Sequence, residues 1–233
     1  MAWIDDTCNR RGAAVTLADV TLRDDVIAER ALLADSLEAV GPQAPTGCGQ
    51  WTAFDLGAHV VAGEWAAGVP ASCIRALGAR GVQFHPRPQA VDKFIERTRR
   101  HGFPAVIEHL RRPGPRLLLT GPVVASTLFE VWMHHDDLAR ANDLLHGTPT
   151  HLGQALPALV GYHRLGLPAA RLTIHATDGQ HWVLGDTADP PAFIGAPTAD
   201  LIRWLAGRPT QTALNIAADP AIAQQLHTFL GSI

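Results

Sequence analysis

The sequence contains little cysteine, lysine or tyrosine and has no long hydrophobic run. Its three cysteines, Cys8, Cys48 and Cys73, form no CxxC pair, which excludes a disulfide framework and a four-sulfur zinc site and predicts a reducing compartment. The most apolar stretch, residues 117–129, is interrupted by a Thr-Gly-Pro sequence and is shorter than the ~20 apolar residues that span a bilayer. The acidic N-terminus with no apolar segment after it is unlike a signal peptide. We therefore expect a cytoplasmic protein without a membrane partner.

Charge of either sign is also modest. The chain has 19 basic and 22 acidic residues, a net charge of −3 and 47% apolar residues in a length of 233. This balance argues against nucleic acid as the main partner, and the apolar fraction excludes a disordered chain. The length allows one large folded domain or two smaller ones. The basic residues are all arginine except Lys93, and twelve histidines accompany them, so the central question is which histidines carry chemistry.

Helical periodicity dominates the first two thirds of the chain. Apolar residues recur at helical spacing, and glycine–proline breaks separate the segments. Thr52, with Asp55 three residues later, forms a capping box before the second helix. The segments predict helices at about 17–40, 52–68, 71–79, 87–101, 104–112, 122–142 and 151–165. We expect four principal helices and accessory turns, as in a helical bundle.

The pattern changes near residue 168. Residues 171–177 alternate apolar and polar side chains, and an Asp-Gly turn and a return strand at 181–184 follow, which is typical of a β-hairpin. Further elements are expected at about 198–206 (helix), 212–217 (strand) and 220–230 (helix). We therefore predict an α+β protein with an N-terminal arm (1–16), a helical bundle (17–167) and a small α+β domain (168–233).

Two histidines and a glutamate are the best candidates for metal ligands. Glu130 and His134 are four residues apart, so they lie on one helix face, where they can hold one divalent metal. The alternative is a solvated Glu–His pair, but the helix is apolar, and an unpaired carboxylate or imidazole inside a bundle is costly. His59 lies in another apolar helix, where by itself it is typical of a hydrogen-bonded core histidine. Together the three match the ligand count of a catalytic zinc with an open position.

Three segments resemble one known family. Residues 44–60 (APTGCGQWTAFDLGAHV) resemble the PTPC-GW-T-DL-AH signature of the mycothiol-dependent maleylpyruvate isomerase family, within the DinB-like metalloenzymes. Residues 130–137 (EVWMHHDD) are similar to its second metal segment, and residues 196–208 (APTADLIRWLAGR) to its C-terminal, sterol-carrier-like domain. The resemblance covers residues 17–233 and implies a DinB-like four-helix bundle followed by a small α+β domain.

The resemblance also implies a chemistry. It implies a divalent metal, expected to be zinc, on three ligands: His59, Glu130 and His134. The thiol of mycothiol would bind at the open position as a thiolate, and Arg208, rather than Arg203, would hold an anionic substrate or cofactor. A metal-bound thiolate is a nucleophile at neutral pH, which suits isomerisation of a cis-enone carboxylate or S-transfer to another small electrophile. We expect a monomer or homodimer.

Two other functions stay open: a non-catalytic protein that binds a small apolar ligand between its domains, and a metallohydrolase whose metal activates water. Among the remaining residues, His135 with Asp136 is predicted at the surface or bundle edge, His175 and His181 are predicted to pair across the hairpin, and Cys48 is predicted to be structural. The other histidines have no partner at ligand spacing and are predicted to be solvated or interfacial: His85, His101, His109, His146, His151, His163 and His227.

Overall fold

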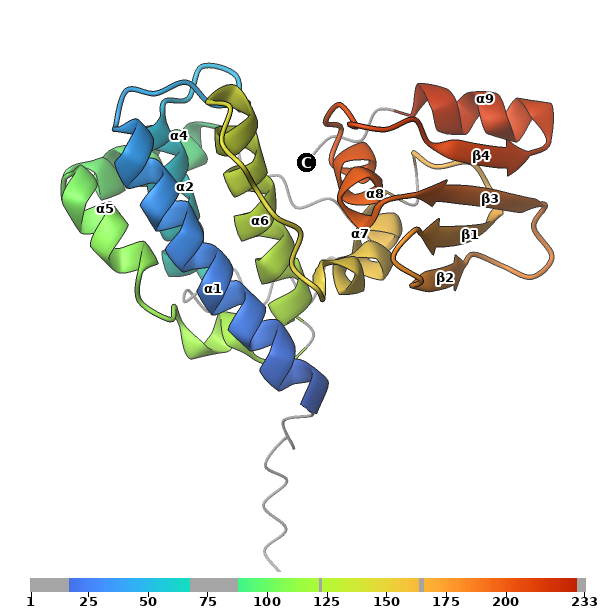
Figure 1. Cartoon of the computed structure of the whole chain (residues 1–233), viewed down its shortest axis with the longest axis horizontal. Coiled ribbons are helices and arrows are strands. Elements are labelled where there is room, and N and C mark those ends of the chain that lie inside the picture. Colours follow the sequence, from blue (N-terminus) through green and yellow to red (C-terminus); the bar gives the residue numbers. More distant parts are fainter. Residues whose placement is uncertain (1–16, 68–87, 122, 164–165, 230–233) are drawn as a thin grey trace, which may run out of the picture.

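The computed structural model describes residues 17–67, 88–121, 123–163 and 166–229. Its N-terminal part is helical and its C-terminal part contains a sheet, so the predicted α+β class is confirmed (Figure 1). The helical part contains α1 (Leu17–Val40), α2 (Ala53–Ala67), α4 (Pro88–Arg99), α5 (Phe103–Leu110), the 3-10 turn η1 (Arg116–Leu119), α6 (Val123–Ala141), the 3-10 turn η2 (Leu152–Ala155) and α7 (Leu156–Tyr162). The predicted arm at 1–16 and the predicted helix at 71–79 lie outside the described residues.

Local sequence signals set the ends of the helices. Gly41 follows the end of α1 and has a φ of 82°, a conformation that glycine adopts without strain. At the start of α2, the Thr52 N–H donates to Asp55 Oδ2 at 3.0 Å, and the Asp55 N–H donates to Thr52 Oγ1 at 3.3 Å. This reciprocal pair is the capping box that the sequence predicts. It fixes the first turn of the helix that carries His59.

The C-terminal part is built on one mixed sheet. Its elements are β1 (Arg171–Ala176), β2 (His181–Leu184), β3 (Pro191–Ala196), α8 (Thr198–Leu205), β4 (Asn215–Ala218) and α9 (Pro220–Thr228). The strand order is β2-β1-β3-β4, and β1 with β2 forms the predicted hairpin, in which His175 pairs with His181. β3 runs parallel to β1 and is not among the predicted strands, because it begins with proline and lacks polar alternation.

Two hydrophobic cores share helix α6. One core contains residues of α1, α2, α5 and α6, among them Val131 and Leu138. The other joins α6 to η2, α7, α8 and the sheet, and it contains Leu128 and Trp132. α1 packs along α6, and α7 and α8 lie between α6 and the sheet (Figure 1). Because α6 is packed on several sides, the polar residues on its remaining face are held in fixed positions.

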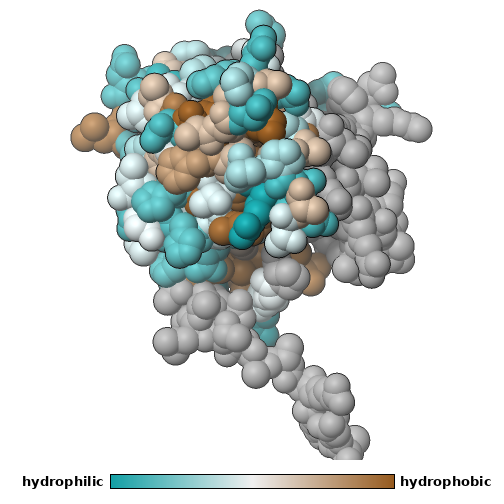
Figure 2. Space-filling view, turned by 90° about the vertical axis from the view of Figure 1, so that its right-hand side faces the viewer, coloured by the Kyte–Doolittle hydropathy of each residue, from teal (hydrophilic) through white to brown (hydrophobic). Residues whose placement is uncertain are grey.

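One face of the sheet is open to solvent. Leu172 and Ile174 of β1 point into the core, whereas Arg171 and His175 are exposed. Figure 2 views the molecule from the end that carries the sheet, on the right of Figure 1. Hydrophobic and hydrophilic residues are interspersed on this surface. None of the helices in the described ranges is both long and apolar enough to traverse a bilayer. The change from helices to strands falls between α7 and β1, and we propose domain limits of 17–167 and 168–233.

Candidate metal centre

Helices α2 and α6 bring the three predicted ligands together. Glu130 and His134 lie one turn apart on α6, and His59 faces them from α2. Glu130 Oε1 lies 3.2 Å from His134 Nε2 and 3.4 Å from His59 Nε2. The two imidazole rings meet edge to face, with centroids 4.9 Å apart. One carboxylate oxygen and two ring nitrogens therefore face a common point.

The spacing of these donor atoms fits a tetrahedral metal ion. Zinc binds imidazole nitrogen and carboxylate oxygen at about 2.0–2.1 Å, so two ligand atoms at a tetrahedral angle lie about 3.3 Å apart. The distances of 3.2 and 3.4 Å around Glu130 Oε1 match this separation. Glu130 exposes 46% of its side chain, so the group can be reached from solvent. Three protein donors with an accessible side are typical of catalytic zinc sites.

A second His–Glu cluster, on another face of α6, has a different geometry. Glu29 Oε1 lies 2.6 Å from His135 Nδ1 and 2.7 Å from His146 Nε2. These distances are those of charge-assisted hydrogen bonds and are too short for two ligands of one zinc ion. The prediction that His135 and Asp136 lie at the surface or bundle edge is wrong, because they expose only 3% and 1%. Ser36 and Glu29 of α1 contact His135, and Arg203 of α8 binds Asp136. Glu29 of α1 compensates for the burial of His135, because its carboxylate is hydrogen-bonded to the imidazoles of both His135 and His146.

The candidate metal centre stabilises charge in the absence of a metal. Desolvation acts to raise the pKa of Glu130, but hydrogen bonds from His134 and His59 outweigh it and hold the pKa well below its usual range. Burial acts to lower the pKa of His134, but hydrogen bonds to Cys48 and Glu130 outweigh it and raise the pKa to about 10. An ionised Glu130 therefore stabilises an imidazolium at His134. A metal must displace that proton, because imidazole coordinates as the neutral base.

Cys48 and Asp137 support the other nitrogen of the His134 ring. His134 Nδ1 lies 3.6 Å from Cys48 Sγ, and the thiol of Cys48 donates to Asp137 Oδ2 at 3.0 Å. Gly47 allows the loop to approach α6 so closely, since a Cβ at this position would lie 3.2 Å from Asp137 Oδ1. Contacts to the second ring nitrogen orient a metal-binding imidazole. Cys48 thus belongs to the surroundings of the metal centre, which spacing along the sequence does not reveal because Cys48 and His134 are 86 residues apart.

Trp51 lies against His59, and Arg208 lies against Asp137. The ring of Trp51 lies 4.7 Å from that of His59, centroid to centroid, and covers it with an apolar surface. Arg208 donates from Nε and Nη2 to the two carboxylate oxygens of Asp137, at 3.3 and 3.0 Å, and keeps 23% of its side chain exposed. Arg203, by contrast, is buried. Arg208 therefore contacts Asp137, the partner of Cys48, and stays partly exposed, whereas Arg203 is buried against Asp136.

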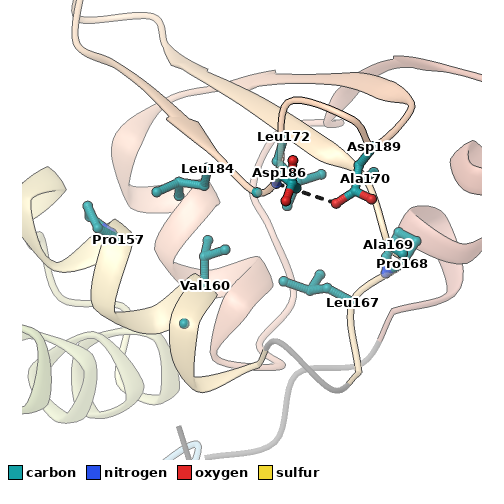
Figure 3. A pocket seen from close by; sticks show the side chains of 12 residues that line it. Pro157, Val160, Leu167, Pro168, Ala169, Ala170, Leu172, Leu184, Asp186 and Asp189 are labelled. Carbon is teal, nitrogen blue, oxygen red and sulfur yellow. Dashed lines mark hydrogen bonds between the residues drawn. The ribbon is translucent and has the colours of Figure 1, made fainter. Parts of the chain in front are cut away.

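Two cavities lie on opposite faces of α7. The larger, of about 750 Å³, is open on one side and is bounded by α7, residues 167–170, β1 and the end of β2. Apolar side chains and two aspartates, Asp186 and Asp189, line it (Figure 3). The smaller, of about 200 Å³, is lined in part by Glu130. α7 presents residues 157, 160 and 161 to the larger cavity and 158, 159 and 162 to the smaller one, as expected for opposite sides of a helix. Of these two cavities, the smaller one adjoins the candidate metal centre.

Comparisons with known proteins give a structural match. No protein-family model and no curated protein matches the chain. A solved structure of a histidine-to-alanine mutant of mycothiol-dependent maleylpyruvate isomerase is similar, with a TM-score of 0.54 and 13% sequence identity over 86% of this chain and 92% of that one. The chain has the fold of that isomerase. A second structure of mycothiol-dependent maleylpyruvate isomerase has a TM-score of 0.49 and 15% identity over the same shares. The fold implied by the sequence resemblance, a helical bundle followed by a small α+β domain, is confirmed.

Proposed function

We propose that the chain is a metal-dependent enzyme that uses a low-molecular-weight thiol of the mycothiol type. It would isomerise a small electrophile such as a cis-enone carboxylate, or transfer the thiol to it. The observation that carries the proposal is the metal-like spacing of the donors of His59, Glu130 and His134, at 3.2 and 3.4 Å. The fold shared with a mycothiol-dependent isomerase supports the thiol chemistry. We further propose that the metal is zinc. We also propose a cytoplasmic location, because the sparse cysteines suit a reducing compartment.

The residues around the centre have distinct roles in this proposal. His59, Glu130 and His134 hold the divalent cation, which when bound deprotonates a coordinating thiol at neutral pH. Trp51 covers His59 and excludes water from that side. Arg208 is the candidate partner of a substrate carboxylate, which would share its guanidinium with Asp137.

The thiol supplies a nucleophile that adds reversibly to the double bond. Addition forms one C–S bond and moves the π electrons of the enone toward its carbonyl oxygen. The former double bond is then a single bond, which rotates. Return of the electron pair breaks the C–S bond and gives the trans isomer, with no net change in protons or oxidation state. The substrate carboxylate would lie against the Arg208–Asp137 pair while the rest of the substrate rotates.

Metal analysis tests the foundation of the proposal. We expect about one metal ion per full-length chain purified without chelator, and loss of most of it in His59→Ala and Glu130→Gln. His146→Gln is the matched control, because His146 belongs to the hydrogen-bonded Glu29 cluster and should leave the metal content unchanged. Wild-type protein with no metal, or equal metal loss in the control, contradicts the assignment.

The thiol requirement separates the functional alternatives. We expect isomerisation of a cis-enone carboxylate, followed by its ultraviolet absorbance, only when mycothiol is added. Hydrolysis of a substrate in thiol-free buffer would instead support a metallohydrolase. The larger cavity, of about 750 Å³ (Figure 3), makes a small-molecule-binding protein the second candidate. Ligand binding without metal or turnover would favour that candidate.

A further inference from the structure

We propose that the smaller cavity, beside Glu130, is a subsite for an uncharged apolar group of the electrophile. The preferred substrates would then carry one carboxylate and one alkyl or aryl group, rather than two carboxylates. This inference rests on the proposed function, because it names the substrate class of the same site.

The cavity has the size and walls for such a group. It lies between α6 and the η2–α7 segment and has a volume of about 200 Å³. Its lining consists of Ser126, Phe129, Glu130, Ala155, Ala158, Leu159 and Tyr162. An apolar cavity of about 150 Å³ is large enough to hold benzene. A phenyl ring or a short alkyl chain therefore fits this space.

Charge disfavours a second carboxylate here. Among the described residues that line the cavity, the charged one is Glu130, and its charge is negative. A carboxylate placed between Phe129 and Leu159 would lose its hydration without gaining a cationic partner from these walls. The apolar end of the electrophile is the group that these walls suit.

The position of Arg208 gives the site two different ends. Arg208 is bound by Asp137, whereas Ser126, which lines the cavity, is eleven residues earlier on α6. Eleven residues of α-helix span about 16 Å, and Glu130 lies between these two positions. An arginine–aspartate pair, a central metal-binding group and an apolar end therefore follow one another along α6. A substrate with a carboxylate at one end and an apolar group at the other matches this order.

Two cis-enone acids that differ in one group test the proposal. cis-3-Benzoylacrylate and cis-3-acetylacrylate share the enone and the carboxylate but carry phenyl or methyl on the ketone. We expect the purified full-length protein to bind the phenyl compound at least tenfold more tightly in calorimetry without thiol. With mycothiol, kcat/KM should favour the phenyl compound by a similar factor.

Two variants tie this preference to the cavity. Ala158 is exposed at the rim of the cavity, so Ala158→Phe should fill the space without disturbing the core and should abolish the phenyl preference. Gln154→Phe is the control, because Gln154 is exposed and lines neither cavity, and it should keep the preference.

Each outcome has a defined meaning. Equal binding of the two acids by the wild type, or an undiminished preference in Ala158→Phe, overturns the subsite. A phenyl preference in binding that Ala158→Phe abolishes, but with no thiol-dependent turnover, supports the subsite while refuting the proposed enzyme function. The failures of the two proposals are therefore distinguishable.

Discussion

Replacement of Arg203 by methionine tests how the C-terminal domain is attached to α6. Arg203 donates from Nε and Nη2 to the two oxygens of Asp136, at 2.9 and 2.6 Å, and from Nη1 to Asp200 at 2.9 Å. The side chains of Arg203, Asp136 and Asp200 expose 6%, 1% and 2%. Methionine keeps an unbranched apolar stem but removes the charge. It therefore leaves the buried carboxylates without their arginine.

We expect this change to lower the free energy of unfolding by about 3–5 kcal/mol, the usual cost of removing one partner from a buried ion pair. Arg140 provides a matched control, because it lies 4.0 Å from the same Asp136 carboxylate but exposes 35% of its side chain. Arg140→Met should cost at most about 1 kcal/mol, as for exposed ion pairs. Burial, and not the count of ion pairs, should decide the difference between the two arginines.

The effect should also depend on pH. Burial acts to raise the pKa of Asp136, but hydrogen bonds from Arg203 and His146 outweigh it and lower the pKa from 3.8 to about 2. This difference corresponds to about 2 kcal/mol. Because the pKa is lowered in the folded state, the stabilisation is present above about pH 4 and is lost as the pH falls toward 2. The stability gap between the wild type and Arg203→Met should narrow over that range.

Urea unfolding followed by circular dichroism, at pH 7 and in steps toward pH 2, measures both effects. A loss below about 1 kcal/mol at pH 7 would refute the assignment of Arg203 as a buried structural cation. A gap that keeps its size in acid would refute the role of the Asp136 charge.

Three further predictions concern the site and its framework. Metal binding at pH 7 should release about one proton, because the pKa of His134 is raised to about 10 in the metal-free protein and the ligand must be neutral; calorimetry in two buffers of different ionisation enthalpy measures this, and no release would contradict it. Gly153→Ala should destabilise by about 1–3 kcal/mol, because the new Cβ would lie 2.8 Å from Trp182; thermal melting should show no such loss for Gly161→Ala, where nothing lies within 4 Å. Thr52→Ala should cost about 1 kcal/mol by removing the N-terminal cap of α2, and Thr52→Ser should recover most of that stability.

The parts of the fold that could be predicted depend on short-range geometry. The Glu130–His134 pair follows from helix periodicity alone, because residues four apart always share a face. The capping box and the β1–β2 hairpin likewise depend on neighbouring residues. The approach of His59 to that pair depends on how α2 packs against α6. The prediction of this approach from the sequence was based on the match of residue types and on the family resemblance.

The parts that could not be predicted depend on partners far along the chain. His135 is polar and follows a predicted ligand, so nothing local indicates that α1 covers it and that Glu29, 106 residues away, binds its ring. The contact of Cys48 with His134 has the same origin. β3 lies between β1 and β4, and its position in the sheet comes from pairing with both strands rather than from its own alternation.

Two consecutive acids on α6 connect the stability of the protein to the geometry of the candidate site. Neighbouring residues of a helix point about 100° apart, so Asp136 and Asp137 face different surroundings. Asp136 holds Arg203 of α8 in the buried region, and Asp137 holds Arg208, which follows a turn at Gly207 with a φ of 69°. The docking of α8 thus sets where Arg208 can lie. Because the Asp136 pair is buried and the Asp137 pair reaches solvent, the first governs attachment of the C-terminal domain and the second leaves its arginine partly exposed.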